Sequence, residues 1–208
     1  MLQPGSPEWL AARCGSIGAS DVARMMRRTT RGAYSADREG LLAEKVLERL
    51  TGVAVDRVKT AAMIQGLERE GPARMTYALI KGVEVVEIEP TPHPSIRGSH
   101  ASPDGLVGDR GLVEIKCPQP AAHLNTLLTE AISEDYLVQM QWQMAVTGRE
   151  WCDYASFNPD FPPEMRLWVR RVPRDTKRIA ELEREMKVFV KEIGLRIDRL
   201  ASRYEKAA

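Results

Sequence analysis

The stretch of sequence that decides the fold is SPDGLVGDRGLVEIKCP, residues 102–118. Its second half, LVEIKC, has the apolar and β-branched composition of a strand. Because side chains two residues apart lie on the same face of a strand, Glu114 and Lys116 should point together, while the apolar residues beside them face the other way. A short hairpin over 106–114, turning through its glycines, would bring Asp104 back beside Glu114. We therefore expect two carboxylates and one amine to meet at one end of a sheet.

These three side chains suit the hydrolysis of a phosphodiester bond. Carboxylate oxygens are hard ligands that favour Mg²⁺ or Mn²⁺, and the chain has no His and Cys set with a common zinc spacing. A metal held by Asp104, Glu114 and the backbone carbonyl of Ile115 would polarise the scissile phosphate and acidify a bound water. Lys116 would either position and deprotonate that water, which requires a lowered pKa, or stabilise the charge of the transition state.

The same residues also fit a segment without catalytic function. Asp104 in Ser-Pro-Asp-Gly is ordinary turn chemistry. Glu114 with Lys116 is typical of a solvated strand face that carries a weak ion pair. The short pattern alone therefore leaves both interpretations open.

Apolar spacing along the rest of the chain predicts an α/β fold in which helices flank a mixed central β-sheet and a long helix ends the chain. Helices are expected over 6–14, from Ser20 through Met26, and over 36–51, 61–81, 136–147 and 175–204. Strands are expected over 83–89, 112–117, 151–157 and 165–172. Pro72 lacks a backbone donor, so we expect a kink or a short break at Gly71–Pro72.

Length and composition bound the class of protein. The 208 residues predict a single domain over 1–208, with a helical part at 1–81, a core sheet at 82–173 and a C-terminal helix at 174–208. Lys and Arg total 30 against 29 Asp and Glu, which excludes a uniformly basic binder but not an enzyme with separate basic and acidic regions. No stretch is apolar enough to span a membrane. Three cysteines and no recognisable secretion signal favour a cytoplasmic location.

Four motifs in the chain resemble the PD-(D/E)xK nuclease core, in the form shared by phage lambda exonuclease and the YqaJ-type viral recombinases. They are SPDG with VEIKCP; W-x₃-R-x₆-S with the string IGASD, which holds Trp9, Arg13 and Ser20; G-x₃-E followed by Ala73-Arg74, which holds Gly66 and Glu70; and Y-x₂-Q-x-Q, which holds Tyr136 and Gln139. Order and approximate spacing agree over residues 6–160, and the remaining strand and helix agree in kind. The resemblance implies a restriction-endonuclease-like core.

The resemblance also implies an activity. It implies a Mg²⁺-dependent 5′→3′ exonuclease that acts on double-stranded DNA ends, releases mononucleotides and leaves a 3′ overhang for phage-type recombination by strand annealing. Mn²⁺ is expected to substitute for Mg²⁺. A homotrimeric ring around DNA, a single-strand annealing protein as partner, and a phage or prophage gene acting in the cytoplasm of a bacterial host are implied as well. An endonuclease of the same fold and a non-catalytic DNA-end-binding protein are the alternatives.

Roles for individual residues follow from the same resemblance. Asp104 and Glu114, with the carbonyl that follows Glu114, would bind the metal, and Lys116 would serve catalysis. Glu70 would lie just outside the metal ligands or assist a second metal. Gln139 would orient the attacking water or the lysine.

A pocket for the terminal 5′-phosphate is implied at Arg13, Ser20 and Ser102, with Tyr136 close by. The guanidinium of Arg13 offers a planar fork of donors that suits phosphate, and Ser20 at a predicted helix start would lie near free backbone N–H groups. The alternative is that Ser20 only caps its helix and Arg13 is solvated.

Two DNA contacts are further extrapolations from the resemblance. Met63 falls where the family carries an apolar wedge that separates the strands, although ordinary core packing would explain it equally well. Arg28 or Arg31, in the basic loop 27–35, would grip the downstream duplex. A generic solvated loop is the alternative there.

Overall fold

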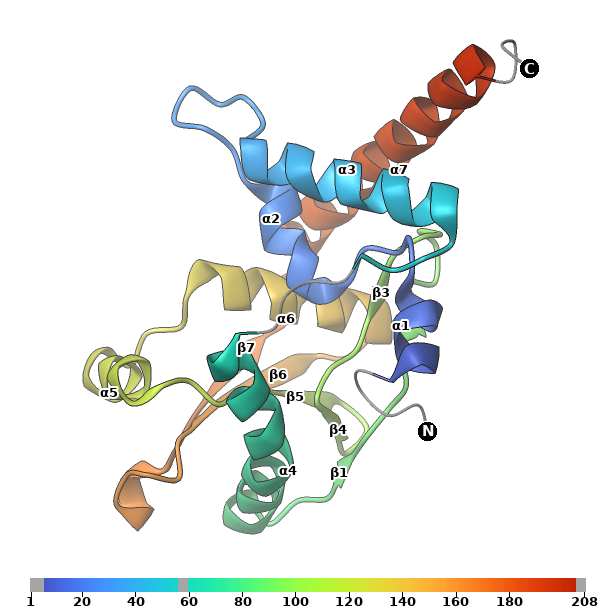
Figure 1. Cartoon of the computed structure of the whole chain (residues 1–208). Helices are drawn as coiled ribbons and strands as arrows, with labels where there is room; N and C mark the ends of the chain where they lie inside the picture. The colour runs from blue at the N-terminus through green and yellow to red at the C-terminus, as the bar shows by residue number, and fades with distance from the viewer. Residues whose placement is uncertain (1–5, 56–59, 205–208) are drawn as a thin grey trace.

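The computed structural model describes residues 6–55 and 60–204 and has the mixed α/β architecture that the sequence predicts (Figure 1). Within these residues the central sheet has five strands in the order β1-β4-β5-β6-β7. They are β1 (Val85–Val86), β4 (Gly105–Val107), β5 (Gly111–Lys116), β6 (Trp151–Phe157) and β7 (Leu167–Pro173). Strand β5 runs parallel to β6, and the other neighbouring pairs are antiparallel. A separate ribbon joins β2 (Thr91–Pro92) and β3 (His100–Ala101).

The hairpin expected over 106–114 is present as strands β4 and β5. Gly105 pairs with Val113 in antiparallel register. Gly108 in the connecting turn has a φ of +53°, a left-handed conformation that glycine adopts without a steric penalty. Because Asp104 precedes β4 directly, this register returns it to the middle of β5, as the sequence predicts.

Four of the helices in the described chain begin at a serine or threonine that caps their first turn. The helices are α1 (Pro7–Arg13), α2 (Val22–Met26), α3 (Ala36–Thr51), α4 (Ala61–Lys81), α5 (Pro120–Thr129), α6 (Glu134–Thr147) and α7 (Thr176–Tyr204), with short 3₁₀ turns at η1 (Ala19–Asp21) and η2 (Pro163–Met165). Hydroxyl groups of Ser6, Ser35, Thr60 and Ser133 accept hydrogen bonds from backbone N–H groups of the first turns. No helix in the described part of the chain is both long and apolar enough to cross a membrane.

The break expected at Gly71–Pro72 is wrong, because α4 continues through both residues. Proline removes one backbone hydrogen bond from a helix interior. Packing on the sheet compensates for that loss: Ala73 is fully buried, and the Tyr77 hydroxyl donates to the Asp153 carboxylate on β6 at 2.8 Å. Tertiary contacts of this kind outweigh helix propensity.

Three further segments differ from the prediction. The strand expected over 83–89 shrinks to Val85–Val86 at the edge of the sheet, because its one neighbour, β4, offers only three residues for pairing. Helix α5 was not predicted at all, although Pro120 stands in its first turn, where proline is favoured. Strand β7 begins two residues later than expected because η2 precedes it.

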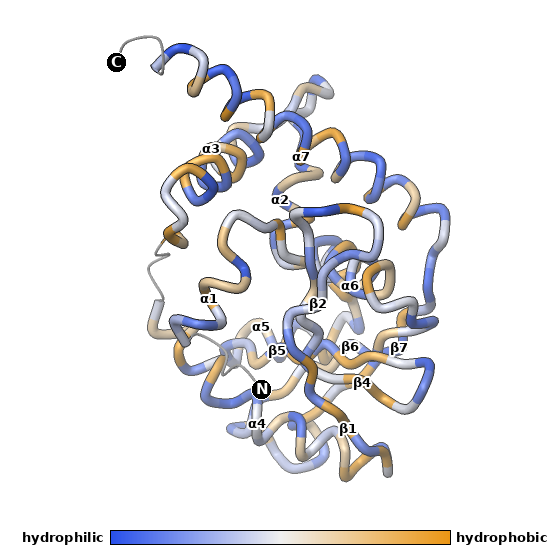
Figure 2. Tube along the Cα trace, turned by 90° about the vertical axis from the view of Figure 1, so that its right-hand side faces the viewer, coloured by the Kyte–Doolittle hydropathy of each residue, from blue (hydrophilic) through white to orange (hydrophobic). Residues whose placement is uncertain are grey.

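Helices cover both faces of the sheet (Figure 1). On one face, Met140 and Met144 of α6 pack with Leu112 of β5. On the other face, Ala73 and Tyr77 of α4 belong to a second cluster with residues of β5 and β6. Helices α2, α3 and α7 pack together on the far side of α6. Apolar and polar segments alternate along α7 (Figure 2), as expected for a helix that buries one stripe.

Candidate active site

One cavity of about 630 Å³ gathers nearly all the residues that the sequence singled out. Its walls come from α1, η1, α4, α6 and the segment from Ser102 through β5. It is lined by Asp104, Glu114, Ile115 and Lys116, by Glu70 and Gln139, by Arg13, Ser20 and Ser102, and by Met63 and Tyr136. Arg28 and Arg31 are not among the lining residues.

Glu114 is the most highly connected carboxylate in the cavity, and its side chain is only 1 % exposed. Its Oε1 atom accepts hydrogen bonds from Lys116 Nζ at 2.5 Å and from Gln139 Nε2 at 2.6 Å. Glu114 and Lys116 therefore share one face of β5, as strand periodicity predicts. Val113 and Ile115 lie on the opposite face, among the apolar residues that pack with α4.

Asp104 is tied to the same strand by a hydrogen bond from Ile115 N to Asp104 Oδ2, at 2.6 Å. The other carboxylate oxygen, Oδ1, makes no hydrogen bond with any described residue. Burial raises the pKa of Asp104 well above its usual range, and repulsion from Glu114 adds to the increase. Glu114 is thus close enough to Asp104 to disfavour the charged form of Asp104.

The surroundings of Lys116 favour its protonated form. Burial lowers the pKa of Lys116, but attraction to Glu114 and Asp104 raises it by more, and the net change is upward. The lowered pKa that a general base would need is therefore not found in the protein without metal. A permanently charged ammonium suits stabilisation of negative charge instead.

Glu70 adds a third carboxylate from α4. Burial raises its pKa, attraction to Lys116 partly opposes this change, and repulsion from Glu114 reinforces it. Three carboxylates, those of Glu70, Asp104 and Glu114, thus lie near the single amine of Lys116. Such an excess of negative charge at hard oxygen donors is the environment that a divalent cation neutralises.

The site fits Mg²⁺ or Mn²⁺ only if backbone or water oxygens act as ligands together with the side chains. Within residues 6–55 and 60–204, no three His, Cys, Asp or Glu side chains converge tightly enough to hold a metal on their own. Asp104, Glu114 and the backbone carbonyl of Ile115 would together offer oxygens from more than side chains, and water is the usual source of the remaining ligands for Mg²⁺.

Sequence reasoning missed Gln143, which holds the other oxygen of Glu114. Gln143 is fully buried in α6, and its Nε2 atom donates to Glu114 Oε2 at 2.6 Å. The signal was present in the sequence, because Gln139 and Gln143 are four residues apart and so share a helix face. Gln141, between them, points elsewhere and bonds to Pro173 O and Asp175 N ahead of α7.

A second group of polar residues lines the cavity beside the carboxylates. Arg13 lies over the Trp9 ring, with 3.9 Å between its Cζ atom and the ring centroid, and its Nε atom donates to His100 Nε2 at 2.9 Å. The Ser102 hydroxyl is buried without a hydrogen-bond partner among the described residues. Ser20 is exposed inside η1, so the expectation that it caps a helix is wrong; Gly18 holds the N-cap position.

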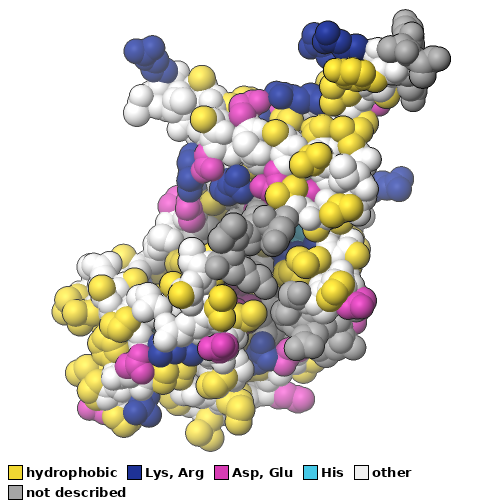
Figure 3. Space-filling view, in the orientation of Figure 1, with side chains coloured by type: hydrophobic (Ala, Val, Ile, Leu, Met, Phe, Trp, Pro, Cys, Tyr) yellow, Lys and Arg dark blue, Asp and Glu magenta, His cyan; other side chains and the backbone are white. Residues whose placement is uncertain are grey.

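The residues suggested to contact DNA have different surroundings. Met63 is 57 % exposed at the start of α4, which rules out ordinary core packing. Tyr136 lies 4.9 Å from Lys116 Nζ, measured to its ring centroid. Arg28 pairs with Glu185 of α7 at 3.0 Å. Arg31 is exposed in the loop between α2 and α3, a region where Figure 3 shows basic side chains at the surface.

Comparison with known proteins decides the family. Residues 8–150 match the model of the YqaJ-like viral recombinase domain. The chain belongs to this family. The matched residues include Arg13, Glu70, Asp104, Glu114 and Gln139, so the cavity lies inside the YqaJ-like part of the chain. No curated protein matches the chain.

Solved structures show the same fold. The alkaline exonuclease LHK-Exo from Laribacter hongkongensis is 41% identical and superimposes with a TM-score of 0.91, over 98% of this chain and 100% of that one. The same values hold for LHK-Exo in complex with dAMP. A phage-related exonuclease from Haemophilus somnus, at 14% identity, matches in fold with a TM-score of 0.73, over 91% of this chain and 96% of that one.

Proposed function

We propose that this YqaJ-like protein is a metal-dependent exonuclease that degrades one strand of double-stranded DNA from its 5′ end. The convergence of Asp104, Glu114 and Lys116 in one cavity is the observation that carries the proposal. The similarity to the alkaline exonuclease LHK-Exo supports it. Release of mononucleotides, with a 3′ overhang left behind, is part of the proposal and agrees with dAMP as the molecule bound to LHK-Exo.

The side chains have separate parts in this reaction. Asp104, Glu114 and the Ile115 carbonyl would hold Mg²⁺, or Mn²⁺ in its place. The bound ion would supply positive charge to the scissile phosphate and acidify a water. Lys116 keeps its proton and stabilises the developing negative charge on phosphate oxygens. Gln139 fixes the shared oxygen of Glu114, so the carboxylate is oriented before substrate arrives.

The cavity would also set the 5′→3′ direction of digestion. Arg13, Ser20 and Ser102 would bind the terminal 5′-phosphate, and the carboxylates of the same cavity would act on the bond one nucleotide further along. The buried hydroxyl of Ser102, without a partner in the described chain, is a donor suited to a phosphate oxygen. Met63 is exposed, lines the same cavity and would separate the DNA strands. Glu70 would support the metal. Tyr136 would lie beside the scissile nucleotide.

The cellular setting is proposed from the family resemblance. A homotrimeric ring around DNA would explain processive digestion, because an enclosed duplex leaves slowly even when each contact is weak. A single-strand annealing protein would use the 3′ overhang in phage-type recombination in the bacterial cytoplasm. Arg28 or Arg31 would contact the duplex outside the cavity, where positive charge strengthens binding to phosphates in a salt-dependent way.

Linear and closed circular DNA separate this proposal from its alternatives. With Mg²⁺, the protein should release acid-soluble nucleotides from a linear 5′-phosphorylated duplex and leave a closed circular duplex intact, and EDTA should stop the reaction. The measurement is acid-soluble product against time for both substrates. Cleavage of the circle would indicate an endonuclease, and tight end binding without metal-dependent release would indicate a non-catalytic binder.

Gln143→Met should weaken both the fold and the site. The change leaves a buried carboxylate one hydrogen bond short, which we expect to lower the free energy of unfolding by about 1–3 kcal/mol. Looser orientation of Glu114 should slow digestion roughly tenfold or more. Urea unfolding and digestion rates measure the two effects. The matched control is Gln141→Met, which should also destabilise the protein but leave the rate unchanged; equal rates in the two variants would contradict a role for Gln143.

A further inference from the structure

Arg13 is held by a histidine that lies far from it in the sequence. Its Nε atom donates to His100 Nε2 at 2.9 Å. The opposite ring nitrogen of His100, Nδ1, is 2.8 Å from the Ser16 hydroxyl oxygen. Both ring nitrogens are therefore engaged, and His100 itself is buried, with 5 % of its surface exposed.

The histidine is a neutral acceptor at this place. Burial lowers the pKa of His100 to about 3, and the positive charge of Arg13 contributes to the decrease. An uncharged ring that accepts at Nε2 must carry its proton on Nδ1, from which it donates to Ser16. The Ser16 contact thus fixes the tautomer that receives the Arg13 hydrogen bond.

The absence of a side chain at Gly18 leaves room for this pair. A Cβ atom at residue 18 would lie 2.9 Å from Arg13 Nη2 and 3.1 Å from His100 Nε2. The first distance is closer than real Cβ contacts, so any larger residue would displace the guanidinium or the imidazole. Gly18 has an extended backbone with a φ of −84°, so the need for glycine here is spatial and not conformational.

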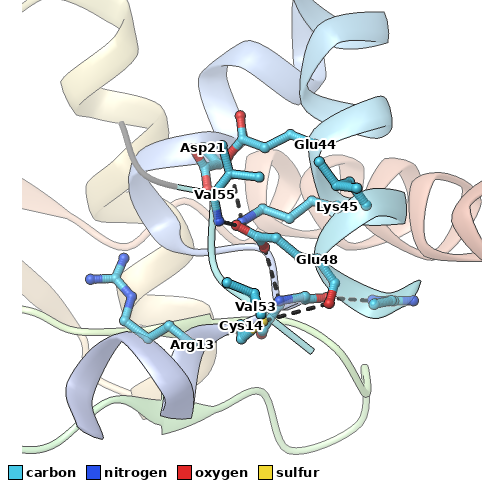
Figure 4. Close-up of polar contacts among 12 residues, drawn as sticks. Arg13, Cys14, Asp21, Glu44, Lys45, Glu48, Val53 and Val55 are labelled. Atoms are coloured by element: carbon cyan, nitrogen blue, oxygen red, sulfur yellow. Dashed lines mark hydrogen bonds and ion pairs between the residues drawn. The ribbon is translucent and has the colours of Figure 1, made fainter. Parts of the chain in front are cut away.

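The backbone around the pair is fixed by α3. Glu48 accepts hydrogen bonds from Gly15 N at 2.9 Å and from Lys45 Nζ at 2.8 Å (Figure 4). Arg49 Nε donates to Gly15 O at 2.7 Å. Figure 4 shows the Arg13 side chain leaving this turn and pointing away from the Glu48 cluster. The turn that follows Arg13 is therefore anchored.

Strand β3 anchors the other partner. The backbone N–H of His100 donates to Ile17 O at 3.0 Å, and its carbonyl accepts from Trp142 Nε1 at 3.2 Å. The backbone of His100 thus joins the N-terminal turn to α6, while its ring bonds to Arg13 and Ser16. Two residues later the same segment supplies Ser102 to the cavity.

We infer that His100 is the positioning residue that sets the specificity of this site for a 5′-phosphate, with Gly18 providing its space. The inference rests on the proposed function. His100 accepts a hydrogen bond from Nε of Arg13 and so fixes the plane of the guanidinium whose terminal nitrogens contact the phosphate. A guanidinium that is already oriented loses less conformational freedom when the phosphate binds, which strengthens binding. Ser16 acts on Arg13 through His100.

The experiment compares duplexes that differ only in a 5′-phosphoryl or a 5′-hydroxyl end. His100→Ala should raise KM for phosphorylated ends roughly tenfold, the loss expected for one charge-assisted hydrogen bond, with kcat changing by less than about twofold. The preference of His100→Ala for the phosphorylated end should fall to the preference of Arg13→Ala. The variant that carries both substitutions should show no further loss of preference. His100→Gln, which places an amide oxygen near the position of Nε2, should restore most of the preference. Arg97→Ala, an exposed arginine near His100, is the matched control and should behave as wild type.

Other variants keep the test decisive if His100→Ala does not fold. Ser16→Ala removes only the hydroxyl that fixes the tautomer, and Gly18→Ala crowds the pair without removing a hydrogen bond. Both should lower the preference for phosphorylated ends. Full preference retained in these variants, or kcat lowered equally on both ends with an unchanged ratio of KM values, would overturn the inference.

A binding measurement in EDTA separates this inference from the proposed activity. Fluorescence anisotropy with the same two duplexes reports the preference without catalysis. A wild-type protein that binds phosphorylated ends more tightly, loses this in His100→Ala and yet never cuts DNA would uphold the inference and reject the nuclease. A wild-type protein that cuts with no preference, in binding or in cleavage, would reject the inference and leave the nuclease standing.

Discussion

Replacing Asp104 with asparagine should lower the rate of DNA-end digestion by at least about 10³-fold, because a metal ligand of this kind contributes several kcal/mol to the transition state. The same change should stabilise the protein in the absence of metal. Asparagine keeps an oxygen that accepts from Ile115 N but removes the charge that burial and Glu114 disfavour. Gain of stability with loss of activity marks a functional residue, since a purely structural residue would lose both.

The gain in stability should depend on pH in a defined direction. The pKa of Asp104 is raised above its unfolded value of 3.8, so above pH 3.8 the unfolded chain releases this proton more readily than the folded protein, and the folded state loses stability. Below pH 3.8 both states are protonated, and the variant and wild type should be equally stable. As the pH rises from 3.8 toward the folded pKa, Asp104→Asn should become progressively the more stable protein, and above the folded pKa the difference should stay constant. Thermal unfolding in EDTA from pH 3 to 8 measures this difference.

The hairpin turn offers a matched control for this prediction. Asp109 is exposed in the turn between β4 and β5, and Asp109→Asn should change neither the digestion rate nor the stability measurably. An Asp104→Asn protein that digests DNA normally, or that unfolds more readily than wild type at neutral pH, would contradict the assignment of Asp104 to the metal.

Replacing Lys116 with methionine should lower the digestion rate by about 10²–10⁴-fold, the range measured for groups that stabilise transition-state charge or transfer protons. Methionine keeps much of the length of the side chain but removes the ammonium that bonds to Glu114 Oε1. The control is Lys81→Met, at an exposed position in the last turn of α4, which should retain full activity. Activity in Lys116→Met within threefold of wild type would reject a catalytic role.

The pH profile of the wild-type rate distinguishes the two roles considered for Lys116. A general base would produce a rate that rises with pH until the amine has lost its proton. Attraction to Glu114 and Asp104 raises the pKa of Lys116, so a charge-stabilising ammonium should contribute no rise in rate between pH 7 and 9.

Local periodicity was sufficient to predict the centre of the site. Alternation along β5 placed Glu114 and Lys116 on one face, and glycines in the preceding turn predicted the hairpin that returns Asp104. These are short-range features: each depends on residues at most about ten positions apart, over which strand geometry carries the inference. Gln139, which the family motifs singled out, lines the same cavity.

Contacts between distant segments were beyond the reach of that reasoning. His100 meets Arg13 across 87 positions, and no local pattern at either residue indicates the other. Helix α4 continues through Pro72 and bonds to the sheet where Tyr77 meets Asp153, a contact across 76 positions. Gln143 could be predicted in part. Its spacing from Gln139 indicates a shared helix face, but the sequence does not indicate that this face lies against Glu114 on β5.

Titration of the protein with Mn²⁺ tests most directly the claim that these acids hold a divalent ion. Isothermal titration calorimetry without DNA, at pH 8, would compare the wild type with Asp104→Asn. We predict saturable binding to the wild type and an affinity at least about tenfold weaker in the variant, as expected when one ligand is lost. Equal Mn²⁺ affinity in the two proteins, or no binding to the wild type at millimolar Mn²⁺, would contradict the metal site and with it the proposed chemistry.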